Sequence, residues 1–272
     1  MRIESATRFA RIVWEFARKD FRVLRSYRFS FVTGIFAAVY GIVSFRFVSS
    51  LVGGTKYIGN SGQYFRFVVV GVVVAGVMRA STITTATNAR RDQVEGTLEV
   101  LAAQPLPLMT LGLGWAILPV LEELFAALIT IGIAVPLGFG GISPDWPATV
   151  LALVLTAFVF LTIGFVAAAV VLAVQQGVQV AGVTVALLTL LSGAVFPIAV
   201  LPAWLRAISY VSPLTYALRA TRAAILDGGN TGRVATDLLI LVGIAAILLP
   251  VGLIALRTSL AYARARGSLA RF

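Results

Sequence analysis

Long hydrophobic stretches alternate with short polar segments along the whole of this 272-residue chain. A helix of about 20 apolar residues crosses the hydrocarbon core of a bilayer, and six of the stretches approach or exceed that length. We therefore predict an all-α integral membrane protein with six transmembrane helices. The predicted spans are residues 29–51, 64–87, 108–135, 148–174, 178–200 and 237–256.

Residues 146–205 contain no charged side chain and are far too many for a single span. The polar turn Gln175-Gln176-Gly177 divides them into the fourth and fifth predicted helices. The following stretch, residues 201–236, mixes apolar residues with four arginines and is too short for two further spans.

The first 28 residues carry eight basic side chains in an amphipathic pattern. Such a helix lies in the membrane interface with its basic side toward anionic headgroups. The alternative is an ordinary positively charged flank before the first span. We therefore divide the chain into an interfacial helix (1–28), a transmembrane domain (29–256) and a basic tail (257–272). The residues that share roughly one face of the predicted interfacial helix are Phe9, Ile12, Val13, Phe16, Phe21 and Leu24.

Composition supports a membrane protein, because 59% of the residues are hydrophobic and only 12% are charged, against about a quarter charged in an ordinary soluble domain. The net charge of +11 does not indicate nucleic-acid binding, because the basic residues cluster at the chain ends and in short loops. The predicted inner segments hold 14 Lys and Arg residues and the outer loops hold 5. Cytoplasmic loops are rich in Lys and Arg, so both termini of this multi-pass cell-membrane protein are predicted to be cytoplasmic.

The chemistry of most enzymes is missing from this sequence. There is no Cys and no His, which excludes thiolate nucleophiles and His-based catalysis or metal binding. The two lysines, Lys19 and Lys56, do not follow a glycine, so the Gly-Lys-Ser/Thr end of a P-loop is absent. We therefore predict a transport subunit and not an enzyme, with no metal site. Its energy would come from a partner subunit or from an ion gradient.

A compact polar segment, residues 88–104, separates the second and third predicted spans. It is predicted to be a short charged helix that ends before Pro105 and Pro107. One interpretation is an ordinary solvated loop. The other is a docking helix on which Leu98 and Leu101 form an apolar knob. In that second interpretation the polar edges are Arg91, Glu95 and Glu99.

Ionisable residues inside spans are a second group of candidates, because they usually face a partner or a water-filled path. Glu122 and Glu123 lie in the middle of the third predicted span, about 100° apart around the helix. One would face the translocation path and the other a neighbouring helix. Arg79, in the second predicted span, is a possible ion-pair partner, although it could also extend to the cytoplasmic interface. The fourth to sixth predicted spans show no comparable residue in their interior.

Three motifs occur in order between these spans. Arg91 precedes Gly96-Thr97-Leu98-Glu99, Ser192-Gly193 precedes Phe196-Pro197, and Pro213-Leu214-Thr215-Tyr216 comes before the last span. In this arrangement the chain resembles the ABC type-2 export permeases, the bacterial drug, polyketide and polysaccharide exporter group. The spacer between Arg91 and Gly96 is one residue longer than the family pattern.

The resemblance implies a homodimer, or a heterodimer with a similar permease, that binds two copies of a separate ABC ATPase. ATP and Mg²⁺ would be held by that ATPase and no cofactor by this chain. Residues 91–102 correspond to the cytoplasmic coupling helix that docks into the ATPase, with Leu101 among its docking residues, and residues 1–28 to the interfacial connecting helix. Residues 201–236 correspond to short re-entrant helices at the outer face. The matched positions of this outer gate are Phe196, Pro197, Pro213, Leu214, Thr215 and Tyr216.

The sequence therefore predicts the permease subunit of an ATP-driven exporter. The cargo would be a lipophilic drug, a lipid or a glycoconjugate that leaves the cytoplasm or the inner leaflet. The expected partners are the ATPase, a second permease and membrane lipids, without nucleic acid. Two alternatives remain: a secondary transporter driven by an ion gradient, and a membrane assembly or immunity factor that transports nothing.

Overall fold

The computed structural model describes residues 28–52, 60–104, 107–140, 142–174, 177–228 and 231–265. The predicted interfacial helix, except for its last residue, and the end of the basic tail lie outside these ranges. Regular structure within them is entirely helical. The elements are α2 Arg28–Val52, α3 Ser61–Arg79, η1 Ala80–Thr84, α4 Thr85–Val94, α5 Thr97–Ala103, α6 Leu108–Ala134, η2 Val135–Leu137, α7 Trp146–Ala173, α8 Gly177–Leu191, η3 Ile198–Val200, α9 Ala203–Ser209, α10 Pro213–Leu226 and α11 Thr231–Ala265.

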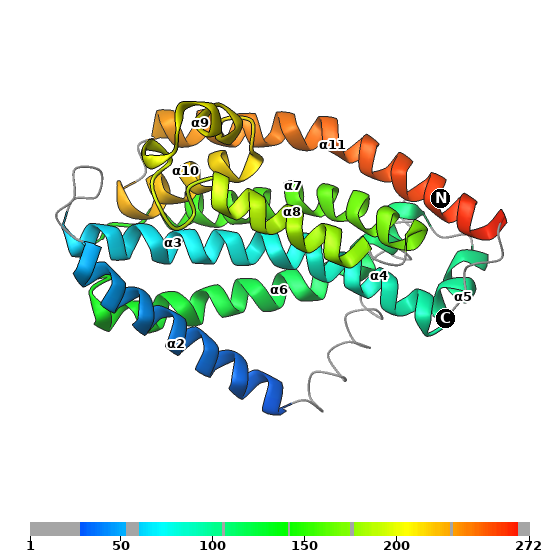
Figure 1. Cartoon of the computed structure of the whole chain (residues 1–272), viewed down its shortest axis with the longest axis horizontal. Helices are drawn as coiled ribbons and strands as arrows, with labels where there is room; N and C mark the ends of the chain where they lie inside the picture. The colour runs from blue at the N-terminus through cyan, green and yellow to red at the C-terminus, as the bar shows by residue number, and fades with distance from the viewer. Residues whose placement is uncertain are drawn as a thin grey trace.

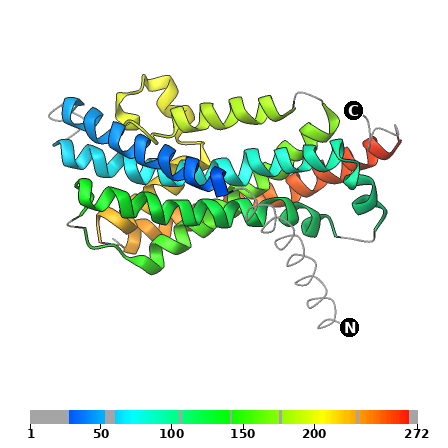
Figure 2. The same cartoon turned by 90° about the horizontal axis from the view of Figure 1, so that it is seen from below.

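The long helices run roughly side by side in an elongated bundle, with different structures at its two ends (Figure 1). The short helix α5 and the junction with α4 lie at one end. The short helices α9 and α10 and the beginning of α11 lie toward the other end, as Figure 2 also shows. The two ends are therefore candidates for two different tasks.

Four helical stretches in the described residues are long and apolar enough to cross a membrane: Ser61–Val94, Leu108–Leu137, Trp146–Ala173 and Gly232–Ala263. They coincide with the second, third, fourth and sixth predicted spans. The other two predictions fall on the shorter apolar helices Phe36–Leu51 and Gly177–Leu191. Helix α8 has 15 residues, or about 22 Å at 1.5 Å per residue, and the chain turns at residues 192–197, inside the predicted fifth span.

The helix of the second span is longer than predicted, because α3, η1 and α4 follow one another without interruption from Ser61 to Val94. The polar residues 88–94, assigned from the sequence to a separate segment, therefore extend this helix. Its middle part, η1, is π-helical, a local widening of the helix that is frequent at functional sites. Thr82 of η1 donates a hydrogen bond to the carbonyl oxygen of Phe160 at 3.3 Å. This bond ties the widened turn to α7.

Helix α7 is the central element, and it packs most extensively against α11. Gly252 permits this approach, because a Cβ atom there would stand 2.7 Å from the carbonyl oxygen of Thr162. Phe160 and Phe165 on α7 are fully buried. In contrast, α6 and α11 leave many apolar side chains uncovered by the protein, as helices in contact with lipid do.

Residues 192–228 contain the short helices η3, α9 and α10, and no spanning helix was found among them. Short helices were expected between the fifth and sixth spans, while their re-entrant placement at the outer face stays a prediction. Helix α10 buries Leu214, Ala217, Leu218 and Ile225 against the bundle. Its start is tied to α9, because Thr215 donates to the carbonyl oxygen of Ser209 at 2.6 Å.

Candidate functional site

The junction of α4 and α5, residues 85–103, is the first candidate site, and we call it the elbow. Helix α4 ends at Val94 and α5 begins at Thr97. Gly96 has a φ of 72°, in the left-handed region where glycine is favoured at helix ends. The amide of Glu95 bonds to the carbonyl of Arg91 at 2.9 Å, and that of Gly96 to the carbonyl of Gln93 at 3.3 Å. These bonds close α4 and set the direction of α5.

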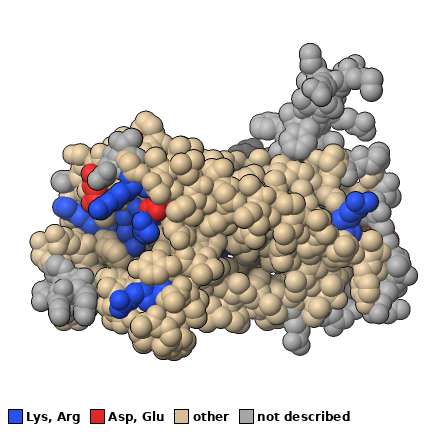
Figure 3. Space-filling model, turned by 90° about the horizontal axis from the view of Figure 1, so that it is seen from above, with Lys and Arg blue, Asp and Glu red and all other residues tan. Residues whose placement is uncertain are grey.

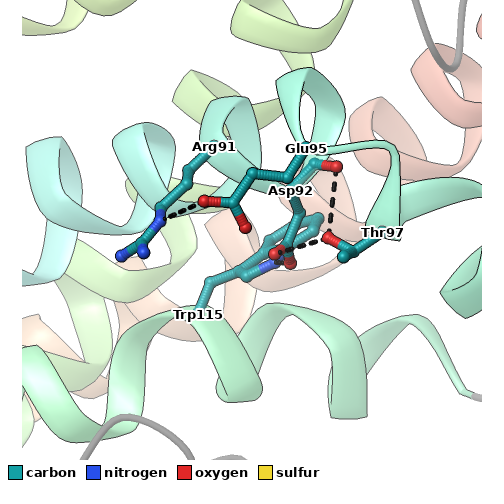
Figure 4. A network of polar contacts seen from close by, with 5 residues as sticks. All are labelled: Arg91, Asp92, Glu95, Thr97 and Trp115. Carbon is teal, nitrogen blue, oxygen red and sulfur yellow. Dashed lines mark hydrogen bonds and ion pairs between the residues drawn. The ribbon is translucent and has the colours of Figure 1, made fainter. Parts of the chain in front are cut away.

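A buried carboxylate holds the elbow together (Figure 4). Asp92 is almost fully buried, and its Oδ2 atom accepts a hydrogen bond from Nε1 of Trp115 at 2.7 Å. The hydroxyl of Thr97 donates to Oδ1 of the same carboxylate at 3.0 Å. A buried charge is stabilised only when it has such partners. Asp92 thus joins α4 both to α5 and to α6.

Further polar contacts fix the elbow to the bundle. The side-chain amide of Asn88 donates to the carbonyl oxygen of Trp115 at 2.8 Å, and that of Gln93 donates to the carbonyl oxygen of Leu172 at 3.3 Å. Arg90 holds Gln93 in place through a 2.7 Å hydrogen bond to its Oε1 atom. The elbow is therefore attached to α6 and to the end of α7.

Leu98 is fully buried, so its predicted place in an exposed apolar knob is wrong. Its side chain belongs to a cluster with residues of α6, α7 and α11, against which Leu101 is packed while partly buried. The reason is that the turn at Gly96 directs this face of α5 toward the bundle. The cluster comprises Ala89, Leu98, Leu111, Trp115, Ala168, Leu172, Leu256 and Leu260.

The opposite side of the elbow is uncovered. Val100 is 63% exposed and Val94 is also exposed. Arg91 and Glu95 form an ion pair at 2.7 Å on this side, and Glu99 is exposed. We call these five residues the outward elbow surface. Thr97, predicted to belong to the docking motif, instead turns its hydroxyl inward to Asp92.

The predicted ion pair inside the spans is present. Nη2 of Arg79 lies 3.3 Å from Oε2 of Glu123, and the two side chains are 60% and 22% exposed. The carboxylate of Glu123 lies over Gly76 of α3, where a side chain would collide with it. Glu122 is exposed on a different side of α6, so the two neighbouring glutamates face different surroundings. The place of one of them on a translocation path stays a prediction.

At the other end of the bundle, Arg222 of α10 joins three segments. Its guanidinium donates to the carbonyl oxygens of Phe67 at 3.1 Å and of Gly193 and Ala194 at 3.0 Å each. It also stacks on the Phe67 ring, 3.4 Å from the centroid. Since Gly193 and Ala194 directly follow α8, this one side chain fixes the end of α8 to α3.

The predicted gate motif and its neighbours form local hydrogen bonds of their own. The Ser192 and Ser212 hydroxyls are 2.5 Å apart, and Tyr216 donates to the carbonyl oxygen of Tyr210 at 2.7 Å. Leu214 is fully buried, whereas Phe196 is only partly so. Pro197 precedes and caps η3, and Pro213 is the first residue of α10. The structure thus brings the segment after α8 and the start of α10 together. The role of the motif residues as a gate stays a prediction.

Sequence reasoning missed several of these polar residues. Asp237 seemed to begin the sixth span, but α11 starts at Thr231, and the side chain of Asp237 is only 3% exposed, 3.3 Å from Arg219. The statement that the last three spans lack interior ionisable residues is therefore wrong. Asp92, Trp115 and Arg222 were missed because their partners are far away in sequence. The sequence did hold a weak signal for two of these residues: Asp92 and Asp237 are acids that lie next to the apolar stretches predicted as spans.

The sequence model of the ABC-2 type transporter family matches residues 14–226. The chain belongs to this family. Its predicted resemblance to ABC type-2 permeases is thus confirmed, and its long apolar helices are those of a multi-pass membrane protein. It is also similar to "Nodulation protein J" of Sinorhizobium fredii (strain NBRC 101917 / NGR234), with 28% identity over 174 residues. That alignment covers 62% of this chain and 64% of the relative, which is less than two thirds of its length.

No group of three or more His, Cys, Asp or Glu side chains that could hold a metal ion occurs in the part of this ABC-2 permease that the structure describes. Glu95, Glu123 and Asp237 instead pair with arginines, and Asp92 accepts hydrogen bonds from neutral donors. The arrangement is therefore suited to fixing helices relative to one another.

Proposed function

We propose that this chain is the membrane subunit of an ATP-driven exporter, and that a separate ATPase docks on the outward elbow surface. The observation that carries the proposal is the two-sided elbow. One side is buried against three long helices through Leu98 and Asp92, and the other presents Val94, Val100 and charged residues to a partner. Exposed apolar side chains surrounded by charges are typical of a protein interaction surface.

The contacts of the elbow also connect α5 to the long helices, so that a displacement of α5 would displace them. A displacement of α5 acts on Asp92 through Thr97 and on α6 through Trp115. It acts on α11 through the packing of Leu98 against Leu256 and Leu260. Because packed helices shift as units and do not deform gradually, ATP binding in the partner would move α6 and α11 together.

The remaining features of the proposal follow from family membership and from the charge distribution. Both termini and the elbow face the cytoplasm of a cell membrane, and the permease works as a homodimer or with a similar partner, bound to two ATPase copies. ATP and Mg²⁺ are held by those copies. The cargo is a lipophilic drug, a lipid or a glycoconjugate, which suits the apolar spans.

Co-purification with candidate ABC ATPases of the source organism tests the proposal. We expect Val100→Asp and Glu99→Arg to abolish binding of the ATPase without loss of folded permease. Gly96→Pro should also abolish binding of the ATPase, because proline cannot adopt the φ of 72° that the turn between α4 and α5 requires. Asp227→Arg is the matched control, since this exposed acid lies beyond α10, at the other end of the bundle. Retention of the ATPase by both Val100→Asp and Glu99→Arg would contradict the docking site.

One observation favours the alternative of a secondary transporter, namely the acids Glu123 and Asp237 inside apolar helices. Such residues occur in ion-coupled transporters. Vesicles that contain this chain alone distinguish the two mechanisms. Flux driven by a proton or sodium gradient without any ATPase, and lost in Asp237→Asn, would support the alternative and contradict ATP-driven export. Absence of flux under every condition would favour a factor that transports nothing.

A further inference from the structure

Basic residues gather at the end of the bundle opposite the elbow. Figure 3 shows most of the visible Lys and Arg side chains over the region of α10 and the beginning of α11. This arrangement is unexpected, because Lys and Arg are ordinarily enriched on the cytoplasmic side, and this end is the outer one in the proposed orientation. Among the described residues, six arginines belong to it: Arg46, Arg66, Arg206, Arg219, Arg222 and Arg233.

Four of these arginines are engaged within the protein. Arg66 donates to the carbonyl oxygen of Gly140 at 2.5 Å, and Arg206 donates to the carbonyls of Ala199 and Leu201 at 2.9 and 3.2 Å. Arg46 lies beside the Phe65 ring, and Arg222 donates to three carbonyls. They fix loops and helix ends. Arg219 also has a partner inside the protein, the carboxylate of Asp237, but its side chain is still 51% exposed. Arg233 is exposed as well, so these two side chains are the ones accessible to an external ligand.

Arg219 and Arg233 are both close to one buried carboxylate, that of Asp237: Arg219 contacts it, and Arg233 is one helical turn before it on α11. Nη2 of Arg219 is 3.3 Å from Oδ1 of Asp237, and the Arg219 side chain is still 51% exposed. Arg233 precedes Asp237 by four residues on α11, so both project from the same face of that helix. Arg233 is exposed, and no ion pair or hydrogen bond of its side chain occurs within the described residues. Two positive charges thus accompany one negative charge.

The other acids near this site do not neutralise the second arginine. Asp145 accepts a hydrogen bond from the amide of Ala148 and so caps α7, while Asp227 is exposed just after α10. Asp227 is separated from Arg219 by about two turns of helix, and within the described residues it forms no ion pair with Arg219 or Arg233.

The position of Arg233 along α11 indicates which kind of anion could bind to Arg219 and Arg233. The apolar stretch of α11 begins at Gly232, so Arg233 lies in its first turn, and the first turn of a helix that spans a bilayer would lie near the lipid headgroups. Trp204 and Tyr210 are exposed on the adjoining segment, and Tyr216 links Tyr210 to the start of α10. Trp and Tyr are enriched at the same level of a bilayer. The Arg219 guanidinium lies 5.8 Å from the Tyr216 ring.

We propose that Arg219 and Arg233 form a binding site for the phosphate of an anionic phospholipid headgroup. Arginine recognises phosphate oxygens through paired N–H donors. Asp237 orients Arg219, and the exposed aromatic residues lie beside the acyl chains of the bound lipid. The site lies apart from the elbow and does not depend on ATP-driven export.

The test uses the full-length chain in neutral detergent and follows thermal unfolding as phosphatidylglycerol, phosphatidylcholine or inorganic phosphate is added. We expect phosphatidylglycerol alone to raise the melting temperature at micromolar concentrations. In Arg233→Gln its apparent affinity should fall about fivefold, the usual effect of one basic residue near an anionic surface. Arg257→Gln is the matched control, because this exposed arginine lies near the other end of the same helix.

A second variant separates binding from folding. Arg219→Gln alone leaves Asp237 buried without its partner, so Arg219→Gln is combined with Asp237→Asn, which keeps the pair neutral. We expect the double variant to remain folded and to lose the preference for phosphatidylglycerol. The proposal is overturned if both variants respond to phosphatidylglycerol as the wild type does, or if phosphatidylcholine stabilises equally. An equal effect of inorganic phosphate would overturn the lipid as the source of the phosphate group.

Discussion

The indole of Trp115 donates its Nε1 proton to the carboxylate of Asp92 at 2.7 Å, across 23 positions of sequence. This bond links the elbow to the following helix, because Asp92 is on α4 and Trp115 on α6. Both residues are buried. The elbow is therefore connected to the interior of the bundle through this hydrogen bond.

Replacement of Trp115 by Phe tests the importance of this bond. The variant keeps most of the packing but removes the donor, so we expect the free energy of unfolding to fall by about 1.5–3 kcal/mol. The measurement is unfolding in detergent, together with the ratio of transport to ATP hydrolysis in the reconstituted complex, which should also fall. Trp204→Phe is the control, since Trp204 is 67% exposed. Equal effects of the two substitutions would refute the linkage.

Leu98 and Val100 provide a matched pair on the two sides of α5. We expect Leu98→Ala to lower the free energy of unfolding by about 2–5 kcal/mol, because it creates a cavity among α6, α7 and α11. Val100→Ala should change it by no more than about 0.5 kcal/mol. Equilibrium denaturation of the permease alone checks both values. A greater loss from Val100→Ala than from Leu98→Ala would reverse the assigned orientation of α5.

Gly71 lies where the chain after α8 crosses α3. A side chain at this position would collide with the carbonyl oxygen of Ala194 and stand 3.0 Å from Nη2 of Arg222. We therefore expect Gly71→Ala to separate the two segments, to weaken the Arg222 hydrogen bonds and to lower the melting temperature. Gly182→Ala should be neutral or mildly stabilising, because open space surrounds that position on α8 and alanine favours helix. Melting curves that rank the two variants in the opposite order would contradict this contact.

The Arg79–Glu123 pair is suited to a double-mutant cycle. Arg79→Gln and Glu123→Gln should each destabilise the protein, and the double variant should lose less than the sum of the two. The expected coupling energy is about 0.5–3 kcal/mol. Arg257→Gln combined with Glu123→Gln serves as the distant control and should be additive. A coupling energy of zero for Arg79 and Glu123 would show that the ion pair has no role in the folded permease in detergent.

The sequence alone determined the location of the hydrophobic helices, the polar interruption between the second and third spans and the family. Hydrophobicity and turn residues are local properties, so α6 and α7 were found to within a few residues. The elbow was located too, although residues 88–94 turned out to continue the second helix.

Only the tertiary structure decided which side chains face inward. Lipid-facing and core-facing positions are both apolar, so the sequence gives no contrast from which to orient a membrane helix. The docking knob predicted from the sequence contains Leu98 and not Val100, yet Leu98 is buried and Val100 is 63% exposed. The partners of Arg222 are likewise distant, since Phe67 is 155 positions away. Such contacts depend on how separate helices pack together, and that packing is a property of the whole chain.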